Sequence, residues 1–172
     1  TSVAKVFELT IAATGNSERL LKQKGIDYQA IHLHPNSHAG YYPGASPIHL
    51  KLLFDSSGKI LGAQAIGTKG VEKRIDVIAT AMRFGAKADE LASIELSYAP
   101  PYSSAKDPVN LLGYTADNLL NQRVRTFQWH EVDALLEKQA FFLDIREEFE
   151  LATGKLADPT WIPLNQLRQR LT

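Results

Sequence analysis

The sequence has 172 residues, of which 44% are hydrophobic, and its 19 basic residues balance its 19 acidic residues. This length suffices for one full domain, or for one domain plus a fragment, with an ordinary core. The zero net charge gives no electrostatic reason to expect nucleic acid or an acidic membrane surface as a partner. No apolar stretch is long enough to span a bilayer. We therefore expect a cytoplasmic protein with no membrane or nucleic-acid partner.

Several kinds of site are excluded by what the sequence lacks. It has no cysteine, which rules out disulfides, cysteine-based metal sites and a thiol nucleophile on this chain. It also has neither a G-x-G-x-x-G fingerprint nor a phosphate loop, so the chain alone is not expected to bind a dinucleotide, and its cofactor-binding residues stay unknown. Because Thr1 begins the chain without a methionine or a signal-like apolar run, we expect a piece cut from a longer protein.

The first third of the chain is predicted to be rich in strands. The clearest signal is a hairpin over 48–54 and 60–66, in which alternate residues are apolar and the turn is Asp55-Ser56-Ser57-Gly58. The other elements predicted here are a strand over 5–13 with Phe7, Leu9 and Ile11 on one face, a helix over 18–24 ending at Gly25, a strand over 28–34 and a loop over 38–47.

Helices are predicted to follow the hairpin. Val71, Ile75, Ile78 and Met82 repeat at helical spacing up to Gly85, which predicts a helix over 71–84 that packs on the apolar face of the hairpin. A shorter helix over 89–94, a loop over 98–108 and a helix over 109–121, opened by Asp107 and Pro108, come next. For residues 1–121 this pattern predicts an α+β fold, a mostly antiparallel sheet with helices on one side.

A second, incomplete unit is predicted after a boundary near 121–126. Strands alternate with helices there, which is typical of a parallel α/β unit, but too few residues remain for an independent core. The predicted elements are a helix over 129–138, a buried strand over 140–145, a helix over 147–152, a short strand over 161–164 and a helix over 165–171.

Two clusters of polar residues are given structural interpretations. The histidines at 32, 34, 38 and 49 are expected to be surface or half-buried residues and not metal ligands, because metal sites usually have tighter clusters. The acids at 144, 147, 148 and 150 are expected to favour a helix N-terminus, with Asp144, at a strand end, as a candidate exception.

Two constrained loops each carry tyrosines. Pro100 and Pro101 fix an extended backbone between Tyr98 and Tyr102, so their phenols are held in place. The segment Gly40-Tyr41-Tyr42-Pro43-Gly44 has the same character. Taken alone, each loop could also be a stiff linker or turn with packed aromatic rings.

In this order and spacing, the segments resemble the dimerisation domain of the pyridine nucleotide–disulfide oxidoreductases, nearest to the branch of coenzyme A-disulfide and NADH-dependent persulfide reductases. The resemblance covers nearly all of 1–121, and the loop from Tyr98 to Asn110 is its most specific part. Its other segments are Lys5-Val6-Phe7 with Thr14-Gly15, His38 to Gly44, Gly67 to Gly70, and Lys73-Arg74-Ile75-Asp76.

Residues 124–172 resemble the N-terminal part of a rhodanese-like domain, ending before its cysteine loop. Matching segments are Leu143-Asp144-Ile145-Arg146, Glu148-Phe149, Gly154, Ile162-Pro163-Leu164 and Leu167-Arg168. Residues 155–160 depart from that family's pattern. Fusion of these two domains is characteristic of the persulfide and coenzyme A-disulfide reductases.

The resemblance implies an FAD- and NAD(P)H-dependent homodimer that reduces coenzyme A disulfide, a persulfide or a polysulfide, a small sulfur substrate. The N-terminal FAD and NAD domains of the parent would hold the cofactors, and this chain alone would bind none and be inactive. By position, Tyr41 and Tyr98 match tyrosines that act in trans at the partner subunit's active site. Expected loop support comes from Tyr42, Pro100, Pro101, Tyr102, Lys106 and Asp107.

Two alternatives stay open. An NADH oxidase or peroxidase of the same superfamily is one, although a pair of phenols and a rhodanese fusion argue against it. A non-catalytic dimerisation or interaction module is the other. Neither the choice between NADH and NADPH nor the identity of the sulfur substrate follows from the sequence.

Overall fold

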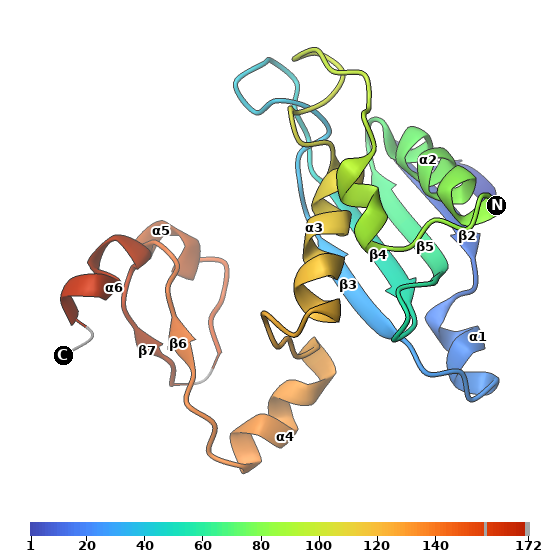
Figure 1. Cartoon of the computed structure of the whole chain (residues 1–172). Helices are drawn as coiled ribbons and strands as arrows, with labels where there is room; N and C mark the ends of the chain where they lie inside the picture. The colour runs from blue at the N-terminus through green and yellow to red at the C-terminus, as the bar shows by residue number, and fades with distance from the viewer. Residues whose placement is uncertain (157, 171–172) are drawn as a thin grey trace. The chain divides into compact units, whose positions relative to one another are not determined.

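The computed structural model describes residues 1–156 and 158–170, and the chain forms two compact units, Thr1–Arg125 and Thr126–Thr172. The first unit is built on a five-stranded antiparallel sheet in the order β1-β2-β5-β4-β3 (Figure 1). Its strands are β1 (Ser2–Val6), β2 (Leu9–Gly15), β3 (Gln29–Leu33), β4 (Ile48–Phe54) and β5 (Ile60–Gly67). Its helices are α1 (Glu18–Gln23), α2 (Val71–Arg83), the 3-10 helix η1 (Asp89–Ser93) and α3 (Pro108–Leu120).

The core lies between one face of this sheet and the helices α2, η1 and α3. Side chains alternate along a strand, so Leu50 and Leu52 of β4 and their partners in β5 point to the same face. Ile75 and Ile78 of α2 are 1% and 0% exposed and belong to the same buried cluster. The predicted α+β fold and the packing of hairpin on helix are confirmed.

Helix α1 is the exception to the arrangement of helices on one side. Its N-cap is Ser17, whose side chain accepts a hydrogen bond from the Leu20 amide. Its Glu18 forms an ion pair with Lys51 of β4. Because Lys51 lies between the core residues Leu50 and Leu52, its side chain projects from the opposite face of the sheet. Helix α1 therefore lies against that face.

The single strand predicted over 5–13 is wrong. Residues 2–15 form a hairpin, in which Val6 pairs with Leu9 across a two-residue turn of Phe7 and Glu8. Phe7 has φ of 53° and is 92% exposed. Turns of this kind are usually marked by Gly, Asn or Asp, and none of these occupies the turn. The apolar alternation therefore continued through it unbroken.

The loop and helix starts near the end of the first unit follow their local sequence signals. Helix α3 begins at Pro108, and Asp107 is its N-cap. The Asp107 carboxylate accepts a hydrogen bond from the Val109 amide at 3.0 Å. Asn110 completes the cap, because its side chain accepts a hydrogen bond from the Asp107 amide at 3.1 Å. The loop that carries Tyr98 and Tyr102 therefore ends at a well-capped helix start.

The second unit contains short elements around one parallel strand pair, β6 with β7. The buried strand predicted over 140–145 is wrong, because only Leu143 and Asp144 pair with a neighbour and Phe141 is 75% exposed. The strand predicted over 161–164 is also only two residues long, and Leu171, at the end of the last predicted helix, lies outside the described residues. The elements are η2 (Trp129–Glu131), α4 (Val132–Glu137), β6 (Leu143–Asp144), α5 (Glu148–Leu151), β7 (Thr160–Trp161) and α6 (Leu164–Arg170).

Among residues 1–156 and 158–170, no helix is long and apolar enough to cross a membrane.

Candidate functional site

The two tyrosine loops of the sequence meet in the first unit. The first loop, residues 34–47, connects β3 to β4, and the second loop, residues 97–107, leads into α3. The hydroxyl oxygens of Tyr41 and Tyr98 lie 3.1 Å apart, although the two residues are separated by 57 positions. Their side chains are 77% and 47% exposed. Two phenols thus share a hydrogen bond at the surface, where a molecule from outside can reach them.

The first loop is closed by its own backbone. The Ser37 amide donates to the Ser46 carbonyl at 2.8 Å, and the Tyr42 amide donates to the Ala39 carbonyl at 2.9 Å. Inside the loop, His38 is 5% exposed, and one of its ring nitrogens lies 3.1 Å from the Ser37 hydroxyl. The expectation that His38 lies at the surface or half-buried is therefore wrong, because it fills the interior of the loop.

The second loop is held by a turn after its two prolines and by a bond to the first loop. The amides of Tyr102 and Ser103 both donate to the Ala99 carbonyl, at 2.9 and 3.2 Å. The Ala39 amide of the first loop donates to the Ser103 carbonyl at 3.0 Å. Backbone hydrogen bonds within and between the loops thus limit how far Tyr41 and Tyr98 can move apart.

A buried ion pair lies beneath both loops. Arg74 of α2 is 2% exposed, and its guanidinium binds the Asp107 carboxylate, with Nη2 to Oδ2 at 2.9 Å and Nε to Oδ1 at 3.4 Å. Asp107, predicted as loop support, thus caps α3 and balances a buried cation. Ser103, also buried, donates its hydroxyl hydrogen to the same carboxylate at 2.6 Å.

The role of Arg74 was missed in the sequence, although a signal for it was present. Arg74 follows Val71 by three residues and precedes Ile78 by four, so it lies on the apolar stripe of α2. A cation on a buried stripe requires a charged or polar partner. The Asp107 that caps the next long helix is such a partner.

The remaining residues predicted as loop support lie around the phenol pair in different ways. The Tyr42 ring packs edge-on against His38, with ring centroids 5.9 Å apart. Tyr102 is 71% exposed. Lys106 donates to the Tyr114 hydroxyl of α3 at 2.8 Å and lies over that ring, 5.1 Å from its centroid. Lys106 is therefore engaged with α3. Pro100 and Pro101 lie in the turn that follows Tyr98.

The contact between the phenols affects how Tyr98 ionises. The hydrogen bond with the Tyr41 hydroxyl, and to a lesser extent burial, raises the pKa of Tyr98 above its ordinary value. Tyr98 therefore keeps its proton at neutral pH and remains a hydrogen-bond donor.

Two of the four histidines contact each other. His34, just after β3, and His49 of β4 have their Nδ1 atoms 2.7 Å apart, so one ring donates and the other accepts. No group of three or more His, Cys, Asp or Glu that could hold a metal ion occurs among the described residues.

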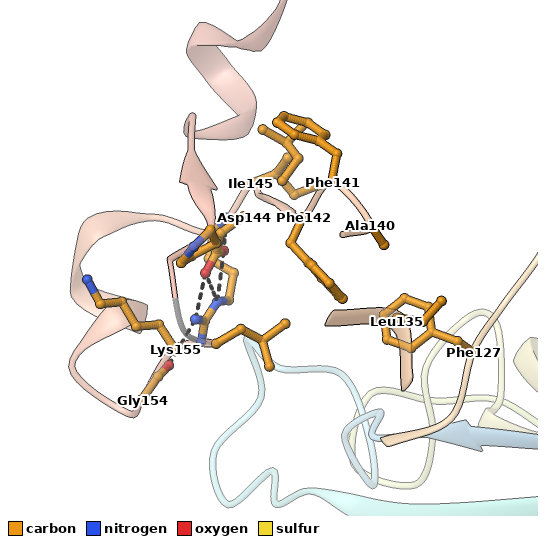
Figure 2. Close-up of a pocket in the computed structure, with 13 residues that line it drawn as sticks. Phe127, Leu135, Ala140, Phe141, Phe142, Asp144, Ile145, Gly154 and Lys155 are labelled. Atoms are coloured by element: carbon orange, nitrogen blue, oxygen red, sulfur yellow. Dashed lines mark hydrogen bonds and ion pairs between the residues drawn. The ribbon is translucent and has the colours of Figure 1, made fainter. Parts of the chain in front are cut away.

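The second unit has an open, mostly apolar pocket of about 990 Å³ (Figure 2). Phe127 and Leu135 lie on one side of it in Figure 2, and Asp144 and Gly154 lie on the other. Arg146 binds Asp144 through two nitrogens, at 3.0 and 2.7 Å, and also binds the Gly154 carbonyl at 2.9 Å. This ion pair lowers the pKa of Asp144 and raises that of Arg146.

Asp144, the candidate exception among the acids, is therefore occupied in holding a turn. The neighbouring acids follow the helix-terminus interpretation. Glu147 is the N-cap of α5, and Glu148 and Glu150 lie in its first turn.

Solved structures are similar to this chain over nearly its whole length. The crystal structure of reduced Bacillus anthracis CoADR-RHD is 53% identical, with a TM-score of 0.96, over 99% of this chain and 31% of that one. An NAD-dependent persulfide reductase from A. fulgidus is 36% identical, with a TM-score of 0.85, over 99% of this chain and 30% of that one. A water-forming NADH oxidase from Lactobacillus brevis, at 22% identity and a TM-score of 0.68, shows only the fold, over 72% of this chain.

Curated relatives point to the same family. A coenzyme A disulfide reductase from Staphylococcus aureus is 45% identical over 116 residues, which are 67% of this chain and 26% of the relative. The chain thus spans about a quarter of the length of the curated relatives it matches. The pyridine nucleotide-disulphide oxidoreductase dimerisation domain matches residues 1–108. This chain belongs to the pyridine nucleotide-disulphide oxidoreductases and carries their dimerisation domain.

Proposed function

We propose that this chain is the dimerisation part of an FAD-dependent NAD(P)H oxidoreductase that reduces coenzyme A disulfide, a persulfide or a polysulfide. In that enzyme, Tyr41 and Tyr98 of one subunit reach the active site of the partner subunit in a homodimer. The family supports the dimerisation role. Relatives with 45% and 36% identity, a coenzyme A disulfide reductase and an NAD-dependent persulfide reductase, support the sulfur chemistry.

The observation that carries the proposal is the 3.1 Å contact between the Tyr41 and Tyr98 hydroxyls. Packing does not require this arrangement, because Tyr41 is largely exposed and Tyr98 about half exposed, and each hydroxyl could be hydrated by water instead. Two loops with separate internal bonding present their phenols to one point. Each hydroxyl has one proton, and one of the two protons lies in the bond between the phenols. An acceptor at that point would therefore receive one hydrogen bond while this bond lasts, and two if the acceptor replaces it.

The chemistry of sulfur reduction explains why donors are needed there. Reduction of a disulfide by NAD(P)H and one proton gives two thiols and NAD(P)⁺, so a thiolate must leave and later gain a proton. A phenol with pKa near ~10 keeps its proton at neutral pH and can donate a hydrogen bond to that sulfur. FAD and NAD(P)H, held by the N-terminal domains of the parent, would supply the electrons. This chain has no dinucleotide fingerprint to hold them.

We also propose two domains, the dimerisation domain over 1–121 and the N-terminal part of a rhodanese-like domain over 124–172. The support is the resemblance of the segments around Asp144 and Gly154, which the Arg146 side chain ties together. The pocket in this unit contains no thiol, because the sequence has no cysteine. Since a rhodanese transfers sulfur through a cysteine persulfide, the purified chain should show no thiosulfate:cyanide sulfurtransferase activity.

An NADH oxidase or peroxidase is the second candidate for the parent enzyme. The Lactobacillus brevis water-forming NADH oxidase shares the fold of the first unit. Oxygen, however, is a small acceptor that needs no pair of phenols at the surface. A non-catalytic dimerisation module is the third candidate, and it fits a chain that contains neither a cysteine nor a dinucleotide fingerprint.

One acceptor panel separates these candidates. NAD(P)H consumption is measured with a full-length protein that contains this chain, using coenzyme A disulfide, coenzyme A persulfide, polysulfide and oxygen as separate acceptors. We expect turnover with at least one sulfur acceptor to exceed turnover with oxygen. Preference for oxygen would favour the oxidase, and no turnover with any acceptor would favour the module.

A further inference from the structure

Among the residues that the structure describes, Arg74 of α2 is the one side chain that bonds to the residue before α2, to both tyrosine loops and to the N-cap of α3. Besides Asp107, its guanidinium donates to the Ser37 carbonyl of the first loop at 2.9 Å and to the Tyr102 carbonyl of the second loop at 3.4 Å. It also donates to the Gly70 carbonyl, just before α2, at 3.1 Å. An arginine is suited to this position because its planar group presents five donors in fixed directions.

These contacts lie close to the phenols along the chain. Ser37 precedes Tyr41 by four residues, and Tyr102 follows Tyr98 by four. The Ala39 amide of the first loop also donates a hydrogen bond to the Ser103 carbonyl of the second loop. A shift of the guanidinium would therefore move the base of both loops at once. The two loops are far apart in the sequence, so their positions relative to each other depend on long-range contacts of this kind.

We propose that Arg74 is a positioning residue that sets Tyr41 and Tyr98 at hydrogen-bonding distance by fixing the bases of the two loops. This inference rests on the proposed function only for its kinetic consequence, because the placement of the phenols can be measured without turnover. The hydrogen bonds of Arg74 go to the bases of the loops and not to the phenols, so its effect passes through the backbone of the loops.

Gly70 gives an independent way to disturb the same contact. A Cβ at position 70 would lie 2.2 Å from Nη1 of Arg74, and the backbone φ of 66° is one that side chains rarely adopt. Gly70→Ala should therefore displace the guanidinium without changing any charge. Arg74→Lys keeps the charge but supplies a single ammonium in place of the planar group. Ser103→Ala is a milder change, since it removes one hydroxyl from the Asp107 carboxylate.

The placement is tested in this chain by NMR of tyrosines labelled at Cζ, with the Tyr98 signal identified through Tyr98→Phe. In the wild type the pH midpoint of Tyr98 should lie above the ordinary ~10, because of its bond with Tyr41. We expect Arg74→Lys, Gly70→Ala and, in smaller measure, Ser103→Ala to lower it toward the midpoint seen in Tyr41→Phe. Two controls on α2 should keep the wild-type midpoint: Arg83→Lys at its exposed end, and Ile78→Val, which loosens the core.

Stability alone cannot mimic this pattern, since Ile78→Val is destabilising but leaves the guanidinium in place. A wild-type midpoint in folded Arg74→Lys, or in folded Ser103→Ala and Gly70→Ala should Arg74→Lys fail to fold, would overturn the proposal. A lowered midpoint in Ile78→Val as well would do the same.

The consequence for turnover is measured in the full-length protein with a sulfur acceptor. Misplacement of a catalytic group by about 1 Å can cost up to roughly 100-fold, so Arg74→Lys should lower kcat by about 10- to 100-fold with a smaller change in KM. If the midpoint falls but Tyr41→Phe and Tyr98→Phe keep full turnover, Arg74 still positions the phenols and the proposed function fails. If Tyr41→Phe and Tyr98→Phe lose turnover while Arg74→Lys keeps both kcat and the midpoint, the positioning role fails and the proposed function stands.

Discussion

Gly113 of α3 lies directly against the backbone of Ala92, just after the middle of η1, and a Cβ at position 113 would come within 2.1 Å of the Ala92 nitrogen. Asn110, one turn earlier, donates from its side chain to the carbonyls of Leu91 and Ile94 at 3.0 and 2.9 Å. These contacts clamp η1 to the first turns of α3. The start of α3 is also where Asp107 binds Arg74, so the clamp supports the second tyrosine loop.

Gly113→Ala should therefore destabilise the protein, although alanine is the better helix former. The gain in helix propensity is about 1 kcal/mol, whereas overpacking against a backbone that cannot give way costs about 1–3 kcal/mol or more. Because the approach to backbone is as short as 2.1 Å, we expect a cost of about 2–3 kcal/mol, and chemical denaturation should show a net loss of about 1–2 kcal/mol in the free energy of unfolding. Asn118→Ala on the same helix is the control and should change it by less than about 0.5 kcal/mol. Equal stability of Gly113→Ala and the wild type would contradict the close approach.

The ion pair between Glu18 and Lys51 should make stability depend on pH in the acid range. The Lys51 ammonium first, and the Tyr28 hydroxyl next, lower the pKa of Glu18 from 4.5 to about 2. Because the folded-state pKa is the lower one, this contribution is present above pH 4.5 and is lost as the pH falls toward 2. Glu18 is partly exposed, so after screening by solvent we expect about 1–2 kcal/mol.

Glu18→Gln should therefore be less stable than the wild type at neutral pH by that amount, with the difference closing as the pH falls to 2. Denaturation midpoints across this range provide the measurement. Glu8→Gln, in the exposed turn between β1 and β2, makes the same change in net charge and serves as the control. A difference between Glu18→Gln and the wild type that grows toward low pH would reverse the predicted sign.

The turn at Phe7 should be improved by glycine. Phe7 has φ of 53°, a conformation that costs a side-chain-bearing residue about 1 kcal/mol, and its ring is 92% exposed. Phe7→Gly and Phe7→Ala both remove the ring, but only glycine relieves the backbone. We expect the free energy of unfolding of Phe7→Gly to exceed that of Phe7→Ala by about 1 kcal/mol. Thermal denaturation should therefore show a higher unfolding temperature for Phe7→Gly. The reverse order would show that the turn is unstrained.

The sequence predicted an element correctly where a regular repeat of apolar residues was followed by residues typical of a turn or of a helix end. Helix α2 has an apolar stripe that stops at Gly85, and the hairpin of β4 and β5 has the turn Asp55 to Gly58. The prediction of one strand over 5–13 was wrong because the turn at Phe7 and Glu8 contains no residue that is typical of turns. The prediction of a strand over 140–145 was wrong because a run of apolar residues does not show how many of them pair with a neighbouring strand.

The candidate site was predictable in its residues but not in its geometry. Proline and glycine marked both tyrosine loops, and Asp107 was recognisable as a helix cap. The distance between Tyr41 and Tyr98 was not predictable, because it depends on long-range contacts through Arg74 and between Ala39 and Ser103. Single-sequence patterns describe neighbours within a few positions, whereas these bonds span 28 to 37 positions for Arg74.

Dimer formation by this chain is a further test. The dimerisation domain matched over 1–108 implies association of two copies. A stable two-fold interface should bury more than ~1,000 Å². An interface of ordinary affinity should keep the chain dimeric at a protein concentration on the order of tens of micromolar. Sedimentation equilibrium should therefore give twice the chain mass at such concentrations, and it should do so for Tyr41→Phe as well. A monomer throughout would count against the two-fold arrangement that places the phenols in trans.

If the Tyr41 and Tyr98 hydroxyls serve sulfur reduction, their removal should change the kinetics of the full-length enzyme. Tyr41→Phe and Tyr98→Phe each remove one hydroxyl and keep the ring, so stability should change by about 1 kcal/mol or less. Loss of a positioned proton or hydrogen-bond donor typically costs about 10²–10⁴-fold, and the double variant should lose less than the product of the single losses.

The measurement is NAD(P)H turnover of both single variants with a disulfide or persulfide and, separately, with a quinone or dye that takes electrons directly from the flavin. We expect a large loss of turnover with the sulfur acceptor and a much smaller loss with the dye. Wild-type turnover of both variants with every sulfur acceptor would contradict this expectation and leave the two phenols a packing role only.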